Sequence, residues 1–167
     1  MSVTCLPTRA APRGLKTANV ERGSLGGLGL NWGCIPTKAL LRSSEIYHYA
    51  THAEAYGLKI EGKVTFDPAS VVKRSRGVSA QLNGGVGFLL KKHKIESFFG
   101  HGSIKAAGTV DVLGDDGKTT SLETKNIVIA TGSDVATPPS VDVAFDEKTI
   151  VSSTGAIALD RVPAKLI

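Results

Sequence analysis

One cysteine of this 167-residue chain stands where a helix is expected to begin. Cys34 lies two residues before Pro36, and proline suits the first position of a helix, where its missing N–H costs no hydrogen bond. Unpaired backbone N–H groups and the positive end of the helix dipole favour the thiolate, the reactive form of cysteine. Lys38, one turn further on, adds positive charge. The alternative interpretation is a buried and inert thiol, and the local pattern alone leaves both open.

Redox chemistry by a disulfide needs two thiols, and the chain has only Cys5 besides Cys34. Cys5 lies before the recognisable part of the fold, and no spacing argument brings it to Cys34. Two cysteines in this length do not form a secreted disulfide scaffold, so a reducing compartment is expected. Arg9, Arg13 and Lys16, without an acid in the first 20 residues, also fit a mitochondrial transit peptide.

The composition is that of an ordinary soluble globular protein, with 41% hydrophobic and 21% charged residues. The longest apolar runs, such as residues 127–130, are far too short to span a bilayer, so no membrane partner is expected. Part of the net charge of +5 comes from residues 91–94, which indicate a solvated helix end. With only 5% aromatic residues, a nucleic-acid partner is not expected. Surface or helix-face positions are expected for the four histidines, His48, His52, His93 and His101.

Local patterns predict helices in the first half of the chain, around one strand. Residues 9–14 resemble the tail of a helix that Gly14 ends, and residues 15–21 resemble a strand. A glycine-rich loop over residues 23–33 precedes a helix over residues 36–50. Asp67 is the expected N-cap of a helix over residues 68–92, in which a Gly-Gly pair at 84–85 indicates close packing or a kink.

In the second half of the chain the hydrophobic period changes to two. Short strands are predicted over residues 95–99, 102–106, 109–113 and 120–124, with a hairpin turn at residues 115–117. Residues 126–133 have the pattern of a buried parallel strand that breaks into a Thr-Gly turn. The final residues, 162–167, resemble the beginning of a further strand.

Five segments resemble the flavin-dependent pyridine nucleotide–disulfide oxidoreductases of class I. Residues 25–41, LGGLGLNWGCIPTKALL, are similar to the active-site segment of the branch that reoxidises dihydrolipoamide with NAD in 2-oxoacid dehydrogenase complexes. The other four are GLKTANVER (14–22), QLNGGVGFLLKKHKI (81–95), IVIATGS (127–133) and DEKTIVSSTGAIAL (146–159). The resemblance covers roughly residues 9–167.

The resemblance implies an α/β fold. It is that of a partial Rossmann-like FAD-binding domain, in three layers, with an antiparallel β-meander inserted in a parallel sheet. Residues 1–14 would be an irregular N-terminus with a remnant of the first helix, and residues 15–167 an incomplete FAD-binding domain. The first strand and the NAD-binding and dimer-interface domains of the family are expected to be absent, so the chain resembles a fragment truncated at both ends.

The same resemblance assigns roles to individual residues. Cys34 would be the thiol that faces the flavin, and Gly29 stands at the position of the cysteine that exchanges with lipoamide. The residues expected to bind FAD are Glu21 at the adenosine ribose, Gly26 and Gly27 at close backbone approaches, Lys38 near the flavin ring, and Thr131, Gly132 and Ser133 in a second flavin turn. The plainer alternatives are turn geometry for the glycines and a solvated strand end for Glu21.

The expected function follows from the same family. Its members use FAD and NAD, form homodimers and bind the lipoyl domains of 2-oxoacid dehydrogenase complexes, in the cytoplasm of bacteria or the mitochondrial matrix of eukaryotes. Because exchange needs a second sulfur, Gly29 together with the expected truncation predicts an inactive chain. The alternatives are a non-catalytic gene fragment and, less favoured, a flavoprotein like NADH peroxidase or coenzyme A-disulfide reductase, whose single cysteine cycles through a sulfenic acid or a mixed disulfide.

Overall fold

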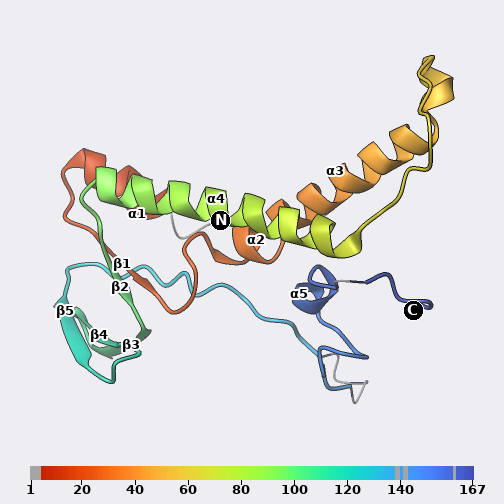
Figure 1. Ribbon diagram of the computed structural model, residues 1–167. Coiled ribbons are helices and arrows are strands. Elements are labelled where there is room, and N and C mark those ends of the chain that lie inside the picture. The colour runs from red at the N-terminus through yellow and green to blue at the C-terminus, as the bar shows by residue number, and fades with distance from the viewer. Residues whose placement is uncertain (1–4, 138–139, 141–142, 160) are drawn as a thin grey trace. The chain divides into compact units, whose positions relative to one another are not determined.

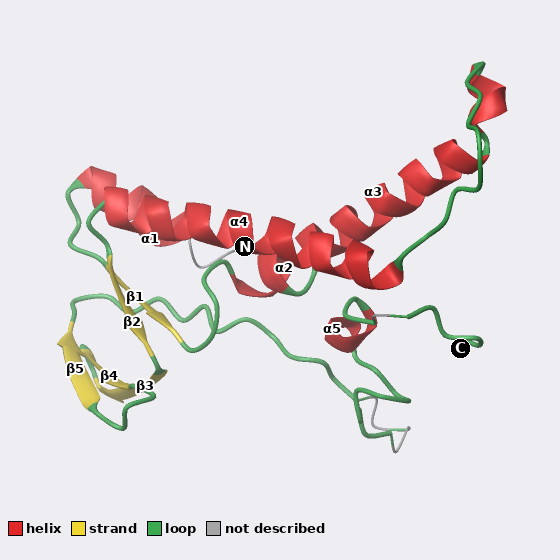
Figure 2. Ribbon diagram, viewed as in Figure 1, coloured by secondary structure: helices red, strands yellow, loops and turns green. Residues whose placement is uncertain are grey.

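The structure is a computed structural model that describes residues 5–137, 140, 143–159 and 161–167. Two long helices and five short strands make up most of its regular structure (Figures 1 and 2). The helices are α1 (Cys5–Ala10), α2 (Gly27–Asn31), α3 (Cys34–Thr51), α4 (Pro68–Lys92) and α5 (Ser153–Ala156), with 3-10 turns η1 (Ala11–Arg13) and η2 (Ala53–Tyr56). The strands are β1 (Ala18–Glu21), β2 (Glu96–Phe99), β3 (His101–Ala106), β4 (Thr109–Leu113) and β5 (Thr119–Glu123).

The chain divides into two compact units. The first unit comprises residues 1–28 and 81–133 and holds all the described strands. The second unit comprises residues 29–80 and 134–167 and holds α3, η2 and α5. Helices α2 and α4 begin in one unit and end in the other. None of the helices among the described residues has the length and apolar character that crossing a membrane requires.

The first unit contains two small sheets. Strands β1 and β2 pair in parallel, with Val20 opposite Phe98, and the long connection between them is the kind that parallel strands require. Strands β3, β4 and β5 form an antiparallel meander, with the predicted turn at Gly117 in the left-handed conformation (φ +77°). Gly102 of β3 lies against Val20, where a Cβ would come within 3.1 Å of the Val20 Cγ1. The predicted α/β class and the inserted meander are confirmed.

Local signals located the ends of several elements correctly. Gly14 ends the η1 turn in the left-handed conformation (φ +82°), as predicted for a C-cap. Asp67 caps α4, because the Ser70 backbone N–H donates to its Oδ1 at 3.3 Å. The buried residues Leu90, Ile95 and Val112 form the apolar core of the first unit. In the second unit the buried residues of α3 and α4 are small, namely Pro36, Ala39, Ser75 and Ser79.

Four predictions differ from the structure. Helix α3 begins at Cys34 and not at Pro36, and the glycine-rich loop contains the short helix α2. Residues 126–133 are not a strand; they are exposed, with 71% of Ile129 accessible to solvent. A strand obtains its backbone hydrogen bonds from a neighbour, and no strand of the described residues pairs with this segment. Residues 162–167 are likewise exposed and without strand structure.

The cap of α4 predicts how stability depends on pH. Hydrogen bonds from the Ser70 hydroxyl and backbone N–H lower the pKa of Asp67. A carboxylate with a depressed pKa stabilises the fold above its unfolded pKa, and this contribution is lost as pH falls through the folded pKa. We therefore expect the melting temperature of the natural chain to exceed that of Asp67→Ala, by a margin that is full above about pH 5 and shrinks as the pH falls from there to about 2.

Asp67→Asn is the matched control, because asparagine retains a capping oxygen and does not titrate. The difference in melting temperature between Asp67→Asn and Asp67→Ala is expected to stay constant over the same pH range. If the difference in melting temperature between the natural chain and Asp67→Ala is also independent of pH, the carboxylate charge has no stabilising role.

Candidate functional site

The Cys34 thiol is accessible and lies at the start of a long helix. Cys34 is the first residue of α3, and the thiol is free and exposed. Gly33 is the N-cap and has no side chain to accept a hydrogen bond from the first turn. Its carbonyl accepts hydrogen bonds from the backbone N–H of Thr37 at 3.1 Å and from the Thr37 hydroxyl at 2.7 Å. The thiol is therefore near the positive end of the dipole and open to reagents, and the buried-cysteine interpretation does not hold.

Position 29 faces this thiol. A Cβ built on Gly29 would lie 3.9 Å from the Cys34 Sγ, which is ordinary van der Waals contact. The short helix α2 produces this approach by turning the chain between Gly27 and Asn31. Lys38 lies one turn after Cys34 on α3, is exposed, and forms no ion pair with any described residue. Gly29, Cys34 and Lys38 thus lie on one short stretch of the second unit.

An arginine of α4 holds the segment that leads to Cys34. The Arg76 Nη1 donates a hydrogen bond to the backbone carbonyl of Asn31, a buried residue. The same guanidinium lies over the Trp32 ring, 4.0 Å from its centroid, in the geometry of a cation–π contact. Sequence reasoning missed Arg76, because nothing local marks a residue 45 positions away as a partner of Asn31.

A second contact from α4 fixes the other end of the glycine-rich segment. The Asn83 Nδ2 donates to the Leu25 carbonyl at 2.7 Å. A Cβ on Gly87 would lie 3.7 Å from the Leu25 Cδ1, whereas Cβ atoms on Gly84 and Gly85 would have nothing within 4 Å. The close approach indicated by the Gly-Gly pair therefore occurs one turn later, at Gly87.

The residues expected to bind FAD lie mostly in the first unit. Glu21 ends β1, is partly exposed, and its Oε1 accepts a hydrogen bond from the Gly23 N–H at 2.9 Å. Gly26 and Gly27 have φ values of +91° and +67°, a conformation that residues with a side chain rarely adopt. In doubly wound folds ligands bind beyond the carboxyl ends of parallel strands, which is where Glu21 and this turn lie.

The second expected flavin turn is open. Thr131, Gly132 and Ser133 are exposed, and Gly132 has a φ of +79° with nothing within 4 Å of its Cβ position. Among the described residues, no hydrogen bond joins this turn to Glu21. The structure therefore brings Gly29 to Cys34 and leaves the turn at residues 131–133 without such a contact.

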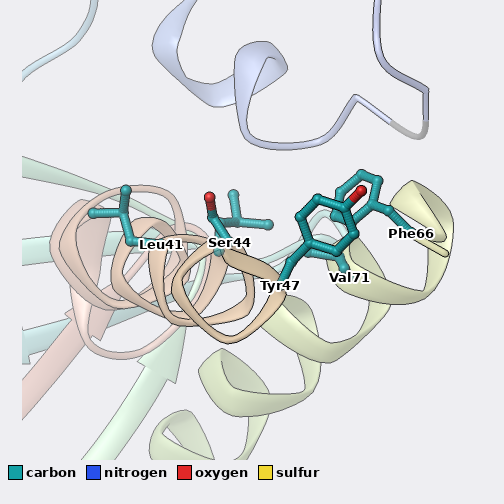
Figure 3. A pocket seen from close by; sticks show the side chains of 6 residues that line it. Leu41, Ser44, Tyr47, Phe66 and Val71 are labelled. Atoms are coloured by element: carbon teal, nitrogen blue, oxygen red, sulfur yellow. The ribbon is translucent and has the colours of Figure 1, made fainter. Parts of the chain in front are cut away.

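An apolar pocket lies elsewhere on α3. It has a volume of about 450 Å³ and is lined by Leu40, Leu41, Ser44, Tyr47, Phe66 and Val71. Figure 3 shows the Tyr47 and Phe66 rings side by side, with centroids 5.8 Å apart. None of the predicted site residues lines this pocket, so it is distinct from the surroundings of the thiol.

Comparison with known proteins gives one family. The family model described as pyridine nucleotide-disulphide oxidoreductase matches residues 4–167. The chain is 46% identical to a dihydrolipoyl dehydrogenase of Trypanosoma brucei brucei, over 95% of its own length and 33% of the relative's. It is 45% identical to a mitochondrial dihydrolipoyl dehydrogenase of Dictyostelium discoideum, over 95% of its own length and 32% of the relative's. The chain thus spans about a third of the length of these relatives.

A solved structure has the same fold. The crystal structure of LpdA from Mycobacterium tuberculosis superposes with a TM-score of 0.80 at 17% sequence identity. The match covers 96% of this chain and 35% of that one.

The contact between positions 29 and 34 predicts a disulfide on substitution. In a Cys5→Ser background, Gly29→Cys is expected to form a disulfide with Cys34 under mild oxidation, because the Cys34 Sγ lies only 3.9 Å from the position of the new Cβ, and a side-chain rotation would bring the two sulfurs together. The measurement is the loss of both free thiols and of two hydrogens in the intact mass. Gly77→Cys is the control, since its Cβ would have nothing within 4 Å. If Gly29→Cys oxidises no faster than this control, position 29 does not face the thiol.

Loss of Arg76 is expected to loosen the segment before Cys34. Removing its hydrogen bond to Asn31 and its contact with Trp32 lowers the free energy of unfolding by about 1–3 kcal/mol. Backbone amides of residues 29–37 then exchange hydrogen faster in Arg76→Ala. Arg76→Lys retains the charge but not the planar contact, so its effect is intermediate. Lys73→Ala, an exposed change on the same helix, is the control, and equal exchange in it and Arg76→Ala would contradict this role.

Proposed function

This chain belongs to the pyridine nucleotide-disulphide oxidoreductase family, and we propose that it forms the FAD-binding region of a dihydrolipoyl dehydrogenase-type flavoprotein. In this proposal residues 15–167 are the FAD-binding domain, and residues 1–14 contain the end of its first helix. The observation that carries it is the accessible thiol at the first residue of α3, with position 29 facing it. This is the arrangement that a redox-active cysteine pair requires.

The residues that surround the glycine-rich turn fit FAD. The positive φ values of Gly26 and Gly27 let the backbone come close to a ligand, and a Cβ on Gly27 would point into open space. Glu21, at the end of its parallel strand, has a carboxylate of the kind that accepts hydrogen bonds from ribose hydroxyls. We propose that Thr131, Gly132 and Ser133 contact the flavin and that Lys38 lies near its ring.

Bound FAD would supply the electron transfer between a dithiol and NAD. The contribution of the protein is to bind the cofactor and to hold the accessible Cys34 thiol at the start of α3. Nothing at position 29 carries sulfur, so Cys34 has no resolving thiol next to it. Attack of Cys34 on the S–S bond of lipoamide would form a mixed disulfide and release the second lipoamide sulfur as a thiolate. Only that returning thiolate, and no protein sulfur at position 29, would then reopen the mixed disulfide. We therefore infer that this chain does not carry out lipoamide turnover through a 29–34 pair.

The proposed partners follow from the same assignment. They are the lipoyl domains of 2-oxoacid dehydrogenase complexes and, for the full-length protein, a second copy in a homodimer. The proposed compartment is the cytoplasm in a bacterium or the mitochondrial matrix in a eukaryote.

Flavin binding tests the proposal directly. The purified chain is mixed with FAD, the excess is removed, and the visible absorption spectrum is recorded. We expect a retained flavin band, and an affinity about tenfold or more weaker in Glu21→Gln, because a hydrogen bond to a charged group is lost. Glu123→Gln, an exposed change on β5, is the matched control. A chain with natural secondary structure that retains no flavin would overturn the proposal.

A further inference from the structure

Two histidines stack at the C-terminal end of α3. His48 lies in the last turn of the helix, and His52 is its C-cap residue. Their ring centroids are 4.2 Å apart and their planes differ by 29°. Both residues are exposed. Their sequence positions predict surface or helix-face histidines, and the proposed flavin chemistry uses neither.

The hydrogen bonds of His52 define which of its nitrogens is available. Its Nδ1 lies 2.8 Å from the backbone carbonyl oxygen of His48. A carbonyl oxygen only accepts, so Nδ1 carries the hydrogen and donates it. Thr51 Oγ1 is 3.1 Å from the same nitrogen, and the Thr51 hydroxyl is itself 3.0 Å from the carbonyl oxygens of Tyr47 and His48. In the neutral ring the lone pair is then on Nε2.

This pattern is the one that supports histidine ligands in metal sites. A ligating histidine usually donates its other ring N–H to a carbonyl or carboxylate, which fixes the tautomer and the ring orientation. The His48 carbonyl holds His52 in that way before any ion is bound. Among the described residues, neither ring nitrogen of His48 has a hydrogen-bond partner, so one remains available as a second ligand.

The spacing of the rings suits one shared ion. Two imidazole nitrogens bound at about 2.0–2.1 Å to a tetrahedral ion are about 3.4 Å apart. The stacked rings have centroids 4.2 Å apart, and both side chains are exposed, so rotation about their χ angles would turn one nitrogen of each ring toward a common ion. The negative end of the α3 dipole also lies here and attracts a cation.

We propose that His48 and His52 form a two-histidine site for a divalent transition-metal ion such as Zn²⁺ or Ni²⁺, with water at the other coordination positions. Imidazole favours these ions over Mg²⁺ and Ca²⁺, which prefer oxygen ligands. No group of three or more histidine, cysteine or acidic side chains among the described residues forms a metal site. The site therefore has two protein ligands, and its dissociation constant is expected on the order of 1–100 µM.

Titration with Ni²⁺ tests the site. All variants carry Cys5→Ser and Cys34→Ser, so that thiols do not bind the metal. We expect one Ni²⁺ per chain by calorimetry, and affinities at least about tenfold weaker in His48→Ala and in His52→Ala. His93→Ala and His101→Ala are the matched controls and are expected to bind as the parent does. Mg²⁺ at the same concentrations is expected to give no heat of binding.

A second measurement needs no histidine substitution. Paramagnetic Ni²⁺ should broaden the imidazole NMR signals of His48 and His52 at substoichiometric amounts and leave those of His93 and His101 sharp. The proposal is overturned if the parent binds no Ni²⁺, if all four histidines broaden equally, or if His48→Ala and His52→Ala bind as tightly as the controls. Both measurements are made without FAD, so their outcome tests the metal site separately from the proposed flavin function.

Discussion

The thiol site depends on hydrogen bonds that side chains of α4 donate to the backbone of the glycine-rich segment, residues 23–33. That segment has few side chains with which to fix its own path, and glycine leaves its backbone many conformations. Asn83 binds the carbonyl of Leu25, and Arg76 binds the carbonyl of Asn31 and covers the Trp32 ring. These contacts tie the main chain on both sides of the short helix α2 to α4. They define where the chain stops turning and α3 begins.

The position of Cys34 follows from that constraint. Because α3 begins at Cys34, the thiol is at the end of a helix of 18 residues and not on a free loop before it. Because α2 turns the preceding residues, position 29 comes within contact of the sulfur. The chain thus keeps the geometry of a two-thiol centre while it has only one of the thiols. The fold that positions the pair does not itself require the second sulfur, since a glycine there is accommodated without strain.

The two ends of α3 have opposite electrostatic character, and each has its own chemistry. The N-terminal end favours an anion and bears the accessible thiol, whereas the C-terminal end favours a cation and bears the stacked histidines. Between them, Arg74 of α4 donates a hydrogen bond to the carbonyl oxygen of Ala39, a buried residue of α3, at 3.0 Å. The ends are far enough apart along the helix that a ligand at one does not contact the other.

The sequence by itself determined the features that rest on neighbouring residues. The cap at Asp67, the left-handed Gly14, the hairpin turn at Gly117 and the pattern around Cys34 each depend on a few consecutive positions. Only the tertiary structure decided the path of residues 25–33, the partner of Asn31 and the contact at Gly87, because these rest on groups distant in sequence. The dependence on distant residues also explains why residues 126–133 do not form the predicted strand. Their apolar pattern is that of a strand, but a strand exists only where another strand supplies its hydrogen bonds, and local sequence does not contain that information.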